Sequence, residues 1–379
     1  MPPPEKNSLL AALLRRRAER AGHPVDKAAL EEVVRKMRLR IGSPSTPFGP
    51  SGLLVKDPML AFRGDPDHPL HDALGYKNLG MPESVDVLVL GNSQVHSLYA
   101  PPQETWPTLL GARTGLAVYN GAMGSYSPIQ YFLGYRELDA LHAGCVVVVL
   151  YMGNNVYNSA NTFRKIPDAF RKGFVASGLE AAANFPTHHA TQIESSDPAK
   201  RIEQFMQAAK TDTEGFCFAR VRQFTHYLLP ALRLAVQNLQ NEFVAGGLEL
   251  ALQSLTKLAG LARERGAPLV VLRMPTKERV VYERHREFGD VKLSAEAALQ
   301  RLWAMEVEAD RRIAEHLAAL AVPSHCLGAP LAALLHEPMY PPLDVDGHPS
   351  LHGRFRVAEM VADFLAGTPA LAPGSNRAL

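Results

Sequence analysis

The sequence predicts an α/β fold built around a parallel sheet, and three observations support this prediction. Short, nearly continuous apolar runs recur along the chain, and stretches with helical periodicity alternate with them. The runs are rich in Val and Leu, which is typical of strands buried on both faces. The first three runs are followed by small or amide residues. Because strands that alternate with helices form right-handed βαβ units, these polar ends are expected at one edge of the sheet.

The composition sets broad limits on function. The 379 residues are 46% hydrophobic and 21% charged, with a formal net charge of +2. This balance gives no reason to expect a nucleic-acid partner. No segment approaches the roughly 18 apolar residues of a membrane-spanning helix, and the N-terminus lacks the features of a signal peptide. We therefore expect a cytoplasmic protein. The three cysteines, Cys145, Cys217 and Cys326, are too widely spaced to indicate a disulfide framework or a CxxC metal pair.

Residues 1–41 are predicted to form an N-terminal extension of two short amphipathic helices. The segment is basic, with ten Lys or Arg and five Asp or Glu. It could contact a membrane surface or a partner. We favour a helical pair packed on the main domain, because both apolar stripes are narrow. The stripes are Leu9, Leu10, Leu13 and Leu14 in the first helix, and Leu30, Val33, Val34 and Met37 in the second.

The rest of the chain is predicted to contain a loop, one main domain and a tail. Residues 42–84 are rich in Gly, Pro and Asp and indicate a long loop or linker. The domain spans 85–366, and residues 367–379 are expected to be flexible. Strands are predicted at 85–90, 117–119, 145–151 and 268–274, and helices at 105–114, 128–142, 247–265, 295–320 and 353–365.

Residues 156–250 interrupt the alternation of strands and helices. Helices are predicted near 198–209 and 218–241, whereas 163–191 has no regular pattern. We interpret this segment as a mostly helical insertion that covers the strand ends. Such an insertion is a candidate lid or a cap that selects the substrate.

Candidate functional residues follow the first three predicted strands. Ser93 follows the first, Gly124 and Ser125 follow the second, and Asn154 follows the third. The carboxyl ends of parallel strands are where ligands bind in open α/β sheets. Ser93 could be a nucleophile there, or only the N-cap of the next helix. Asn154 and Gly124 could likewise be turn residues without a chemical role.

A fourth element offers a base and carboxylates. His348 lies in a loop before the last predicted helix, with Asp346 and Asp344 two and four residues before it. A nucleophilic serine needs a base for its proton, a carboxylate to orient that base, and donors for the oxyanion. With Ser93, these residues could supply the parts of an acyl-transfer site. The alternative of a metal site is weak, because a catalytic zinc usually has three well-placed ligands and no HExxH occurs.

Four short motifs resemble the blocks of the SGNH (GDSL-like) hydrolase superfamily, in the order that this family has. Asn92 and Asn155 stand where the family usually has Asp, and the Asp-x-His spacing is one residue shorter than the commoner one. The stretches 71–78 and 274–278 are also similar to a bacterial subgroup whose members often act on acylated cell-surface glycans. The four blocks are Gly91-Asn92-Ser93, Asn120 to Gly124, Gly153-Asn154-Asn155 and Asp346-Gly347-His348-Pro349.

This resemblance implies a three-layer α/β/α, flavodoxin-like sheet and a mechanism without a cofactor. Ser93 would be the nucleophile, His348 the general base, and Asp346 the residue that orients His348, with Asp344 in reserve. The oxyanion hole would consist of the backbone N–H of Ser93, a backbone N–H of the second block and the side-chain amide of Asn154. The second-block donor would be Gly124, although an ungapped alignment places Ser125 at the family's glycine position.

The sequence therefore supports one main hypothesis and two alternatives. The main hypothesis is a serine esterase that removes a short, acetyl-like acyl group from a hydroxylated, carbohydrate-like substrate. The same residues could instead serve an O-acyltransferase. A third possibility, from another class, is a catalytically silent relative that binds glycan or protein, which the Asn residues at 92 and 155 would favour. The absence of a GxSxG motif argues against the nucleophile elbow of an α/β hydrolase. Neither a Walker A motif nor a GxGxxG after a strand occurs, so the sequence does not indicate a nucleotide site.

Overall fold

The computed structural model describes residues 7–18, 24–41, 53–97, 100–180, 198–341 and 347–369, without the side chains of 38–41, 198–199 and 201–202. Its centre is a five-stranded parallel sheet with the strand order β10-β8-β5-β3-β4. Counted along the chain, these strands have the order 2-1-3-4-5 of flavodoxin-like folds. The predicted α/β fold with a parallel sheet is thus confirmed. The strands are β3 (Val87–Leu90), β4 (Val118–Asn120), β5 (Val146–Tyr151), β8 (Leu269–Met274) and β10 (Ser324–Cys326).

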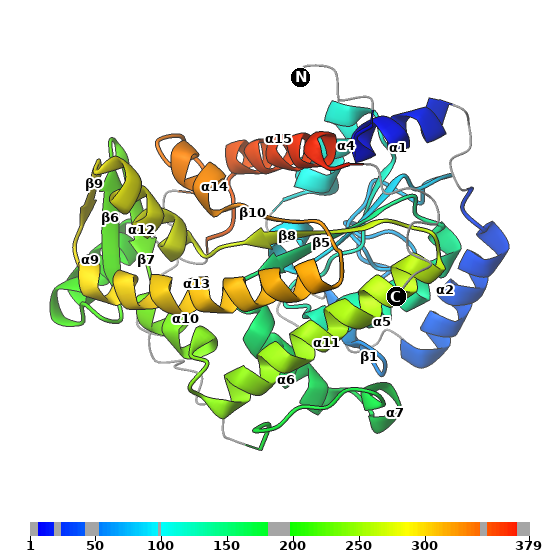
Figure 1. Ribbon diagram of the computed structural model, residues 1–379, viewed down its shortest axis with the longest axis horizontal. Coiled ribbons are helices and arrows are strands. Elements are labelled where there is room, and N and C mark those ends of the chain that lie inside the picture. Colours follow the sequence, from blue (N-terminus) through cyan, green and yellow to red (C-terminus); the bar gives the residue numbers. More distant parts are fainter. Residues whose placement is uncertain are drawn as a thin grey trace.

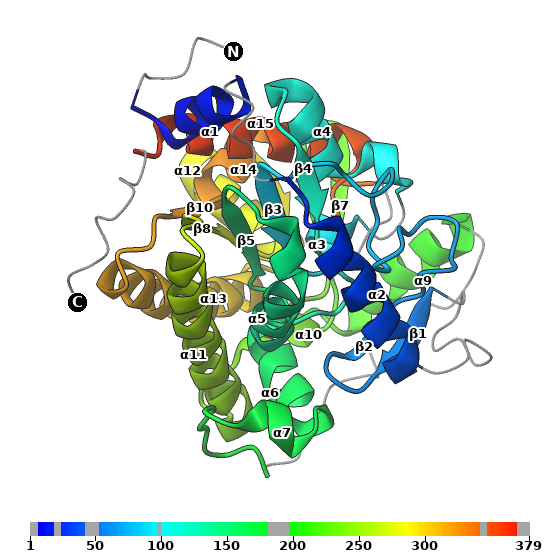
Figure 2. The same ribbon diagram turned by 90° about the vertical axis from the view of Figure 1, so that its right-hand side faces the viewer.

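Helices cover both faces of this sheet, as Figures 1 and 2 show. Successive side chains of a strand point to opposite faces. Val87 and Val89 of β3 accordingly join one hydrophobic core, and Leu88 and Leu90 join the other. This explains why the strands are continuous apolar runs. The first core includes α1 (Leu9–Ala18), α4 (Trp106–Thr114), α12 (Lys277–Phe288), α14 (Gly328–Leu334) and α15 (Leu351–Gly367); the second includes α2 (Lys27–Ile41), α5 (Pro128–Glu137), α11 (Glu242–Glu264) and α13 (Glu296–Ala319).

The two N-terminal helices pack on the main domain. Leu9, Leu10 and Leu13 of α1 are buried in the core that also contains α15. Arg17 pairs with the buried Asp86 at 2.7 Å, just before β3. Met37 of α2 is completely buried. Most of the apolar side chains that could have entered a membrane or contacted a partner are therefore buried against the main domain. None of the described helices is long and apolar enough to span a membrane.

The prediction of a helix over 218–241 is wrong for its first half. That part forms the hairpin β6 (Cys217–Val221) and β7 (Phe224–Leu228), and only then comes α10 (Pro230–Gln237). Burial alternates along β6, and a strand period of two explains this better than a helical one. The hairpin pairs with β9 (Val291–Leu293) in a three-stranded antiparallel sheet, drawn at the left of Figure 1. The insertion is therefore not purely helical.

Several shorter elements were also missed. The predicted loop 42–84 contains the hairpin β1 (Leu54–Asp57) and β2 (Ala61–Gly64). Strand β10 lies in what was predicted to be a loop, since its three residues are too few for a recognisable apolar run. The predicted tail from residue 370 lies outside the described residues. Other elements are α3 (Ser93–His96), η1 (Pro102–Glu104), η2 (Leu138–Leu141), α6 (Asn155–Lys165), α7 (Asp168–Arg171) and α9 (Pro198–Thr211).

Candidate active site

Ser93 is presented by a sharp turn between β3 and α3. Gly91 is needed in this turn, because an added Cβ would lie 2.2 Å from Cγ2 of Val95. The N-cap of α3 is Asn92, whose Oδ1 accepts the backbone N–H of Gln94 at 3.0 Å. The alternative that Ser93 is only the N-cap is therefore wrong. The hydroxyl of Ser93 is left for another partner.

That partner is His348. Its Nε2 lies 2.9 Å from Oγ of Ser93, although the two residues are 255 positions apart in the chain. His348 is half-buried, and its other ring nitrogen, Nδ1, is shielded from solvent. A serine hydroxyl that donates to an imidazole nitrogen at this distance is the nucleophile–base contact of acyl-transfer enzymes. The structure thus brings together the two residues that the sequence proposed as nucleophile and base.

The carboxylates proposed to orient His348 are not placed. Asp344 and Asp346 lie outside the residues that the structure describes. The loop is described again from Gly347, which is buried and has a φ of 76°. A Cβ on Gly347 would lie 3.1 Å from Cβ of Lys277, the first residue of α12. The close approach and the left-handed backbone both favour glycine beside His348.

Asn154 joins the site from the neighbouring strand. β3 and β5 are adjacent and parallel, and the first and third strands of this fold form the switch point where ligands bind. Nδ2 of Asn92 donates to Oδ1 of Asn154 at 2.8 Å across this point. Because Oδ1 of Asn92 accepts the N–H of Gln94, the amine of Asn92 must face Asn154. The oxygen of Asn154 therefore turns to Asn92, and its amine is left as a donor.

Two oxyanion donors proposed from the sequence have no competing acceptor. Neither the side-chain amine of Asn154 nor the backbone N–H of Ser93 donates to an atom of the described residues. The backbone N–H groups in the first turn of a helix have no intrahelical acceptor, and Ser93 is the first residue of α3. Both groups follow neighbouring strands at the same sheet edge.

Two adjacent backbone N–H groups are candidates for the donor proposed in the second block. Residues 123–126 form a tight turn in which the backbone N–H of Tyr126 donates to the carbonyl of Met123 at 3.2 Å. Within it, neither the N–H of Gly124 nor that of Ser125 donates to a described residue. Ser125 has a φ of 63°, a conformation that favours glycine. This matches the alignment that places Ser125 at the family's glycine position.

Asn155 connects three elements behind the site. Its Oδ1 accepts the backbone N–H of Tyr151 at 2.7 Å and the hydroxyl of Tyr131 at 3.1 Å. Its Nδ2 donates to the carbonyl of Tyr126 at 3.0 Å. An ionised aspartate could not make the last bond. The Asn at this position, like Asn92, thus acts as both donor and acceptor.

The 71–78 stretch fixes the second block, a role that its sequence did not reveal. Asn78 pairs with the backbone of Asn120 at the end of β4, through its Oδ1 at 2.9 Å and its Nδ2 at 3.1 Å. Oδ2 of Asp72 accepts from Asn78 and from the hydroxyl of Tyr119. The buried Lys77 donates to the carbonyls of Ser97 and Ala100, which follow α3, and burial lowers its pKa to about 8.

The metal alternative finds no support in the histidine contacts. His352 faces Glu337, with 2.6 Å between Nε2 and Oε2, whereas His348 faces Ser93. Within the described ranges, no group of three or more His, Cys, Asp or Glu could hold a metal ion. The two histidines thus have separate partners.

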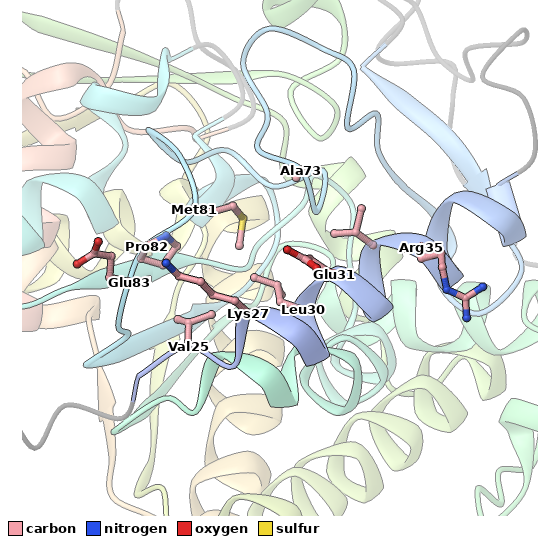
Figure 3. Close-up of a pocket in the computed structure, with 10 residues that line it drawn as sticks. Val25, Lys27, Leu30, Glu31, Arg35, Ala73, Met81, Pro82 and Glu83 are labelled. Carbon is pink, nitrogen blue, oxygen red and sulfur yellow. The ribbon is translucent and has the colours of Figure 1, made fainter.

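A large groove lies away from these residues. It occupies about 680 Å³ between α2 and the segment 73–83 (Figure 3). Its walls are largely aliphatic, with Leu30, Val34 and Met81, and Lys27 and Glu31 also line it. None of its lining residues belongs to the predicted catalytic set. The groove is therefore separate from the predicted catalytic residues.

Comparisons with known proteins add little to this geometry. No family model matches the chain, and no curated protein matches it at a significant level. Among solved structures, it is similar to a candidate lipolytic protein of the G-D-S-L family from Desulfitobacterium hafniense DCB-2. That likeness has a TM-score of 0.37 at 10% identity and covers 73% of this chain and 98% of the other. At this TM-score the likeness carries no argument, so the activity has to be inferred from the geometry around Ser93.

Proposed function

We propose that the protein is a serine-dependent carboxylic-ester hydrolase of the SGNH (GDSL-like) type, acting on a short acyl ester of a hydroxylated, carbohydrate-like alcohol. The contact between Ser93 Oγ and His348 Nε2 at 2.9 Å carries this proposal. It lies at the carboxyl end of β3, next to the switch point of the sheet. The four motif blocks support the family, while the acyl size and the sugar-like alcohol rest on the resemblance alone.

In this mechanism His348 takes the proton of Ser93 as Oγ attacks the ester carbonyl. The tetrahedral intermediate then collapses, and His348 gives the proton to the leaving alkoxide. Water repeats the cycle on the acyl-enzyme and releases the acid. Asp346 would hold His348 in the correct tautomer, and Asp344 is the reserve candidate for that role.

The oxyanion would be bound by three neutral donors. They are the N–H of Ser93, the amine of Asn154 and a backbone N–H of the second block. For that block we favour Ser125 over Gly124, because Ser125 adopts the conformation expected of the family's glycine. Each such donor typically stabilises the transition state by about 2.7–4 kcal/mol.

Two alternatives can be distinguished from the esterase. An O-acyltransferase would use the same residues, with a sugar hydroxyl in place of water. The silent relative was favoured by Asn92 and Asn155, yet both side chains are hydrogen-bonded and leave the Ser93–His348 contact intact. No contact of this structure therefore favours the silent relative over the esterase.

Hydrolysis of an aryl acetate by wild type, Ser93→Ala and His348→Ala tests the proposal. Turnover by wild type and its loss in both variants is the expected result. A folded wild-type protein without turnover on any short acyl ester would contradict the proposal. If added sugar raises turnover and yields acylated sugar, the transferase is the better description.

A further inference from the structure

Two histidines near Ser93 have buried nitrogens without hydrogen-bond partners. His96 is the last residue of α3, one helical turn after Ser93, and is 1% exposed. His71 follows β2, and the two ring centroids are 6.0 Å apart. Nε2 of His71 and both ring nitrogens of His96 are buried and form no hydrogen bond. Leaving such an atom unsatisfied costs about 1–3 kcal/mol, so three in one place call for a ligand.

The histidine pair adjoins the proposed catalytic groups. A Cβ on Gly64 would lie 2.9 Å from Cε1 of His71 and 2.6 Å from Cε of Met123. His71 and Met123, which precedes Gly124, thus meet at Gly64. His96 shares a short helix with Ser93, whose Oγ lies 2.9 Å from Nε2 of His348. The pair therefore lies at the second block, the nucleophile and the base.

The hydrogen-bonding roles of these nitrogens follow from their contacts. Nδ1 of His71 is 2.9 Å from the carbonyl oxygen of Asp65, which can only accept, so Nδ1 carries the proton and Nε2 is an acceptor. Burial lowers the pKa of His71 to about 4 and that of His96 well below its usual value; Lys77 adds to both effects. Both rings are neutral near pH 7. His96 then presents one donor and one acceptor.

The three nitrogens of His71 and His96 present two acceptors and one donor, and only some ligands can hydrogen-bond to all of them. A carboxylate or phosphate ester anion accepts only, and an ammonium group donates only. An acyl chain does neither. A hydroxyl group donates and accepts, so a pair of neighbouring hydroxyls satisfies all three nitrogens.

We infer that His71 and His96 bind hydroxyl groups on the alcohol part of the substrate and so select polyhydroxylated alcohols. The inference rests on the proposed function of Ser93. In that mechanism His348 protonates the leaving oxygen, so the alcohol lies on the side of His348. His96 lies one helical turn after Ser93, which contacts His348 at 2.9 Å, and on this ground we place the pair on the alcohol side of the ester.

Two acetate esters with different alcohols test this inference. One is p-nitrophenyl acetate, whose alcohol has no further hydroxyl, and the other is a mono-acetylated methyl glucoside. His96→Leu should raise KM for the glucoside ester about tenfold, since each lost hydrogen bond is worth about 0.5–1.5 kcal/mol. The ratio of kcat/KM for the glucoside ester to kcat/KM for p-nitrophenyl acetate should fall about tenfold. His96→Gln, which keeps a donor and an acceptor, should restore part of the loss.

Controls separate this inference from the rest of the account. His226→Leu makes the same exchange at another buried imidazole with an unpartnered Nε2, on β7. It should leave the ratio of the kcat/KM values for the two esters unchanged. If His96→Leu does not fold, His71→Leu at the less buried ring gives the same comparison. Equal losses on both esters, or no loss on either, would overturn the inference, the latter indicating bound water only. Fluorophosphonate labelling of Ser93 checks the proposed function independently.

Discussion

Two polar regions adjoin Ser93, and they differ in how their hydrogen bonds are satisfied. In the amide region, Asn92 and Asn155 each form bonds as donor and acceptor and connect the ends of β3 and β5 to the second block. In the imidazole region, three buried nitrogens of His71 and His96 have no partner. Satisfied buried networks fix geometry, whereas unsatisfied groups mark places where a ligand completes the site. The amides are suited to hold the oxyanion donors, and the imidazoles to meet substrate.

The largest effect is expected at the base that lies close to both regions. His348→Ala should lower kcat by about 10⁶-fold, because loss of the base in a serine hydrolase is comparable to loss of the whole triad. Steady-state hydrolysis of an aryl acetate measures this. His352→Ala, which removes a histidine paired with Glu337 instead of Ser93, is the matched control and should keep full activity. Equal losses in both variants would argue against the role of His348.

A smaller loss is expected when the amide region loses its oxyanion donor. Asn154→Asp keeps the shape of the side chain but replaces the free amine by an oxygen. kcat should fall by about 10²–10³-fold with little change in KM, because the donor acts on the transition state. Rates near wild type would show that the amine of Asn154 does not face the oxyanion.

The structural part of the amide region is tested through stability. Asn155→Asp would place a buried carboxylate oxygen 3.0 Å from the carbonyl of Tyr126, where the amine now donates. The free energy of unfolding should fall by about 1–3 kcal/mol in urea denaturation. Asn158→Asp also loses a bond to a second-block carbonyl, that of Ser125, but in an exposed position. It should cost less than about 0.5 kcal/mol.

A buried imidazole on β7 gives a pH-dependent effect. Burial lowers the pKa of His226 to about 3, so the unfolded chain binds a proton that the folded chain does not. This contribution to stability is complete above pH 6.5 and is lost as the pH falls toward 3. Between pH 7 and pH 5, wild type should lose about 2 kcal/mol relative to His226→Gln. Parallel curves for the two proteins in urea denaturation would contradict this.

The smallest effect is expected at the second-block turn. Ser125→Gly relieves a left-handed conformation that costs a non-glycine residue about 1–2 kcal/mol. Part of this gain is offset by the greater freedom of glycine in the unfolded chain. Thermal unfolding should show a gain of about 1 kcal/mol or less, with activity retained because the N–H is unchanged. A loss of stability would indicate that the hydroxyl of Ser125 has a structural role.

The sequence predicted most of the sheet and the contact at its carboxyl edge, although only the sheet and Ser93 follow from local patterns. Buried parallel strands are apolar runs that can be recognised without tertiary information, and their carboxyl ends share one edge. Ser93 and Asn154 were placed by that rule alone. His348 depended on the motif resemblance, because its loop comes near Ser93 only through the packing of α15.

The features that the sequence did not predict depend on tertiary contacts. Strand β10 exists because it pairs with β8, and the hairpin β6–β7 has a partner in β9, neither of which a local pattern shows. His96 is buried at the end of α3. Its lack of hydrogen bonds is visible only in three dimensions. Its position one helical turn after Ser93 was the available signal.

The central claim is that Ser93 is the nucleophile. The most direct measurement is peptide mapping by mass spectrometry after reaction with a fluorophosphonate. We predict one adduct per chain on the peptide that contains Ser93, none in Ser93→Ala, and much slower labelling in His348→Ala. A folded wild-type protein that stays unlabelled, or an adduct that persists in Ser93→Ala, would contradict the claim.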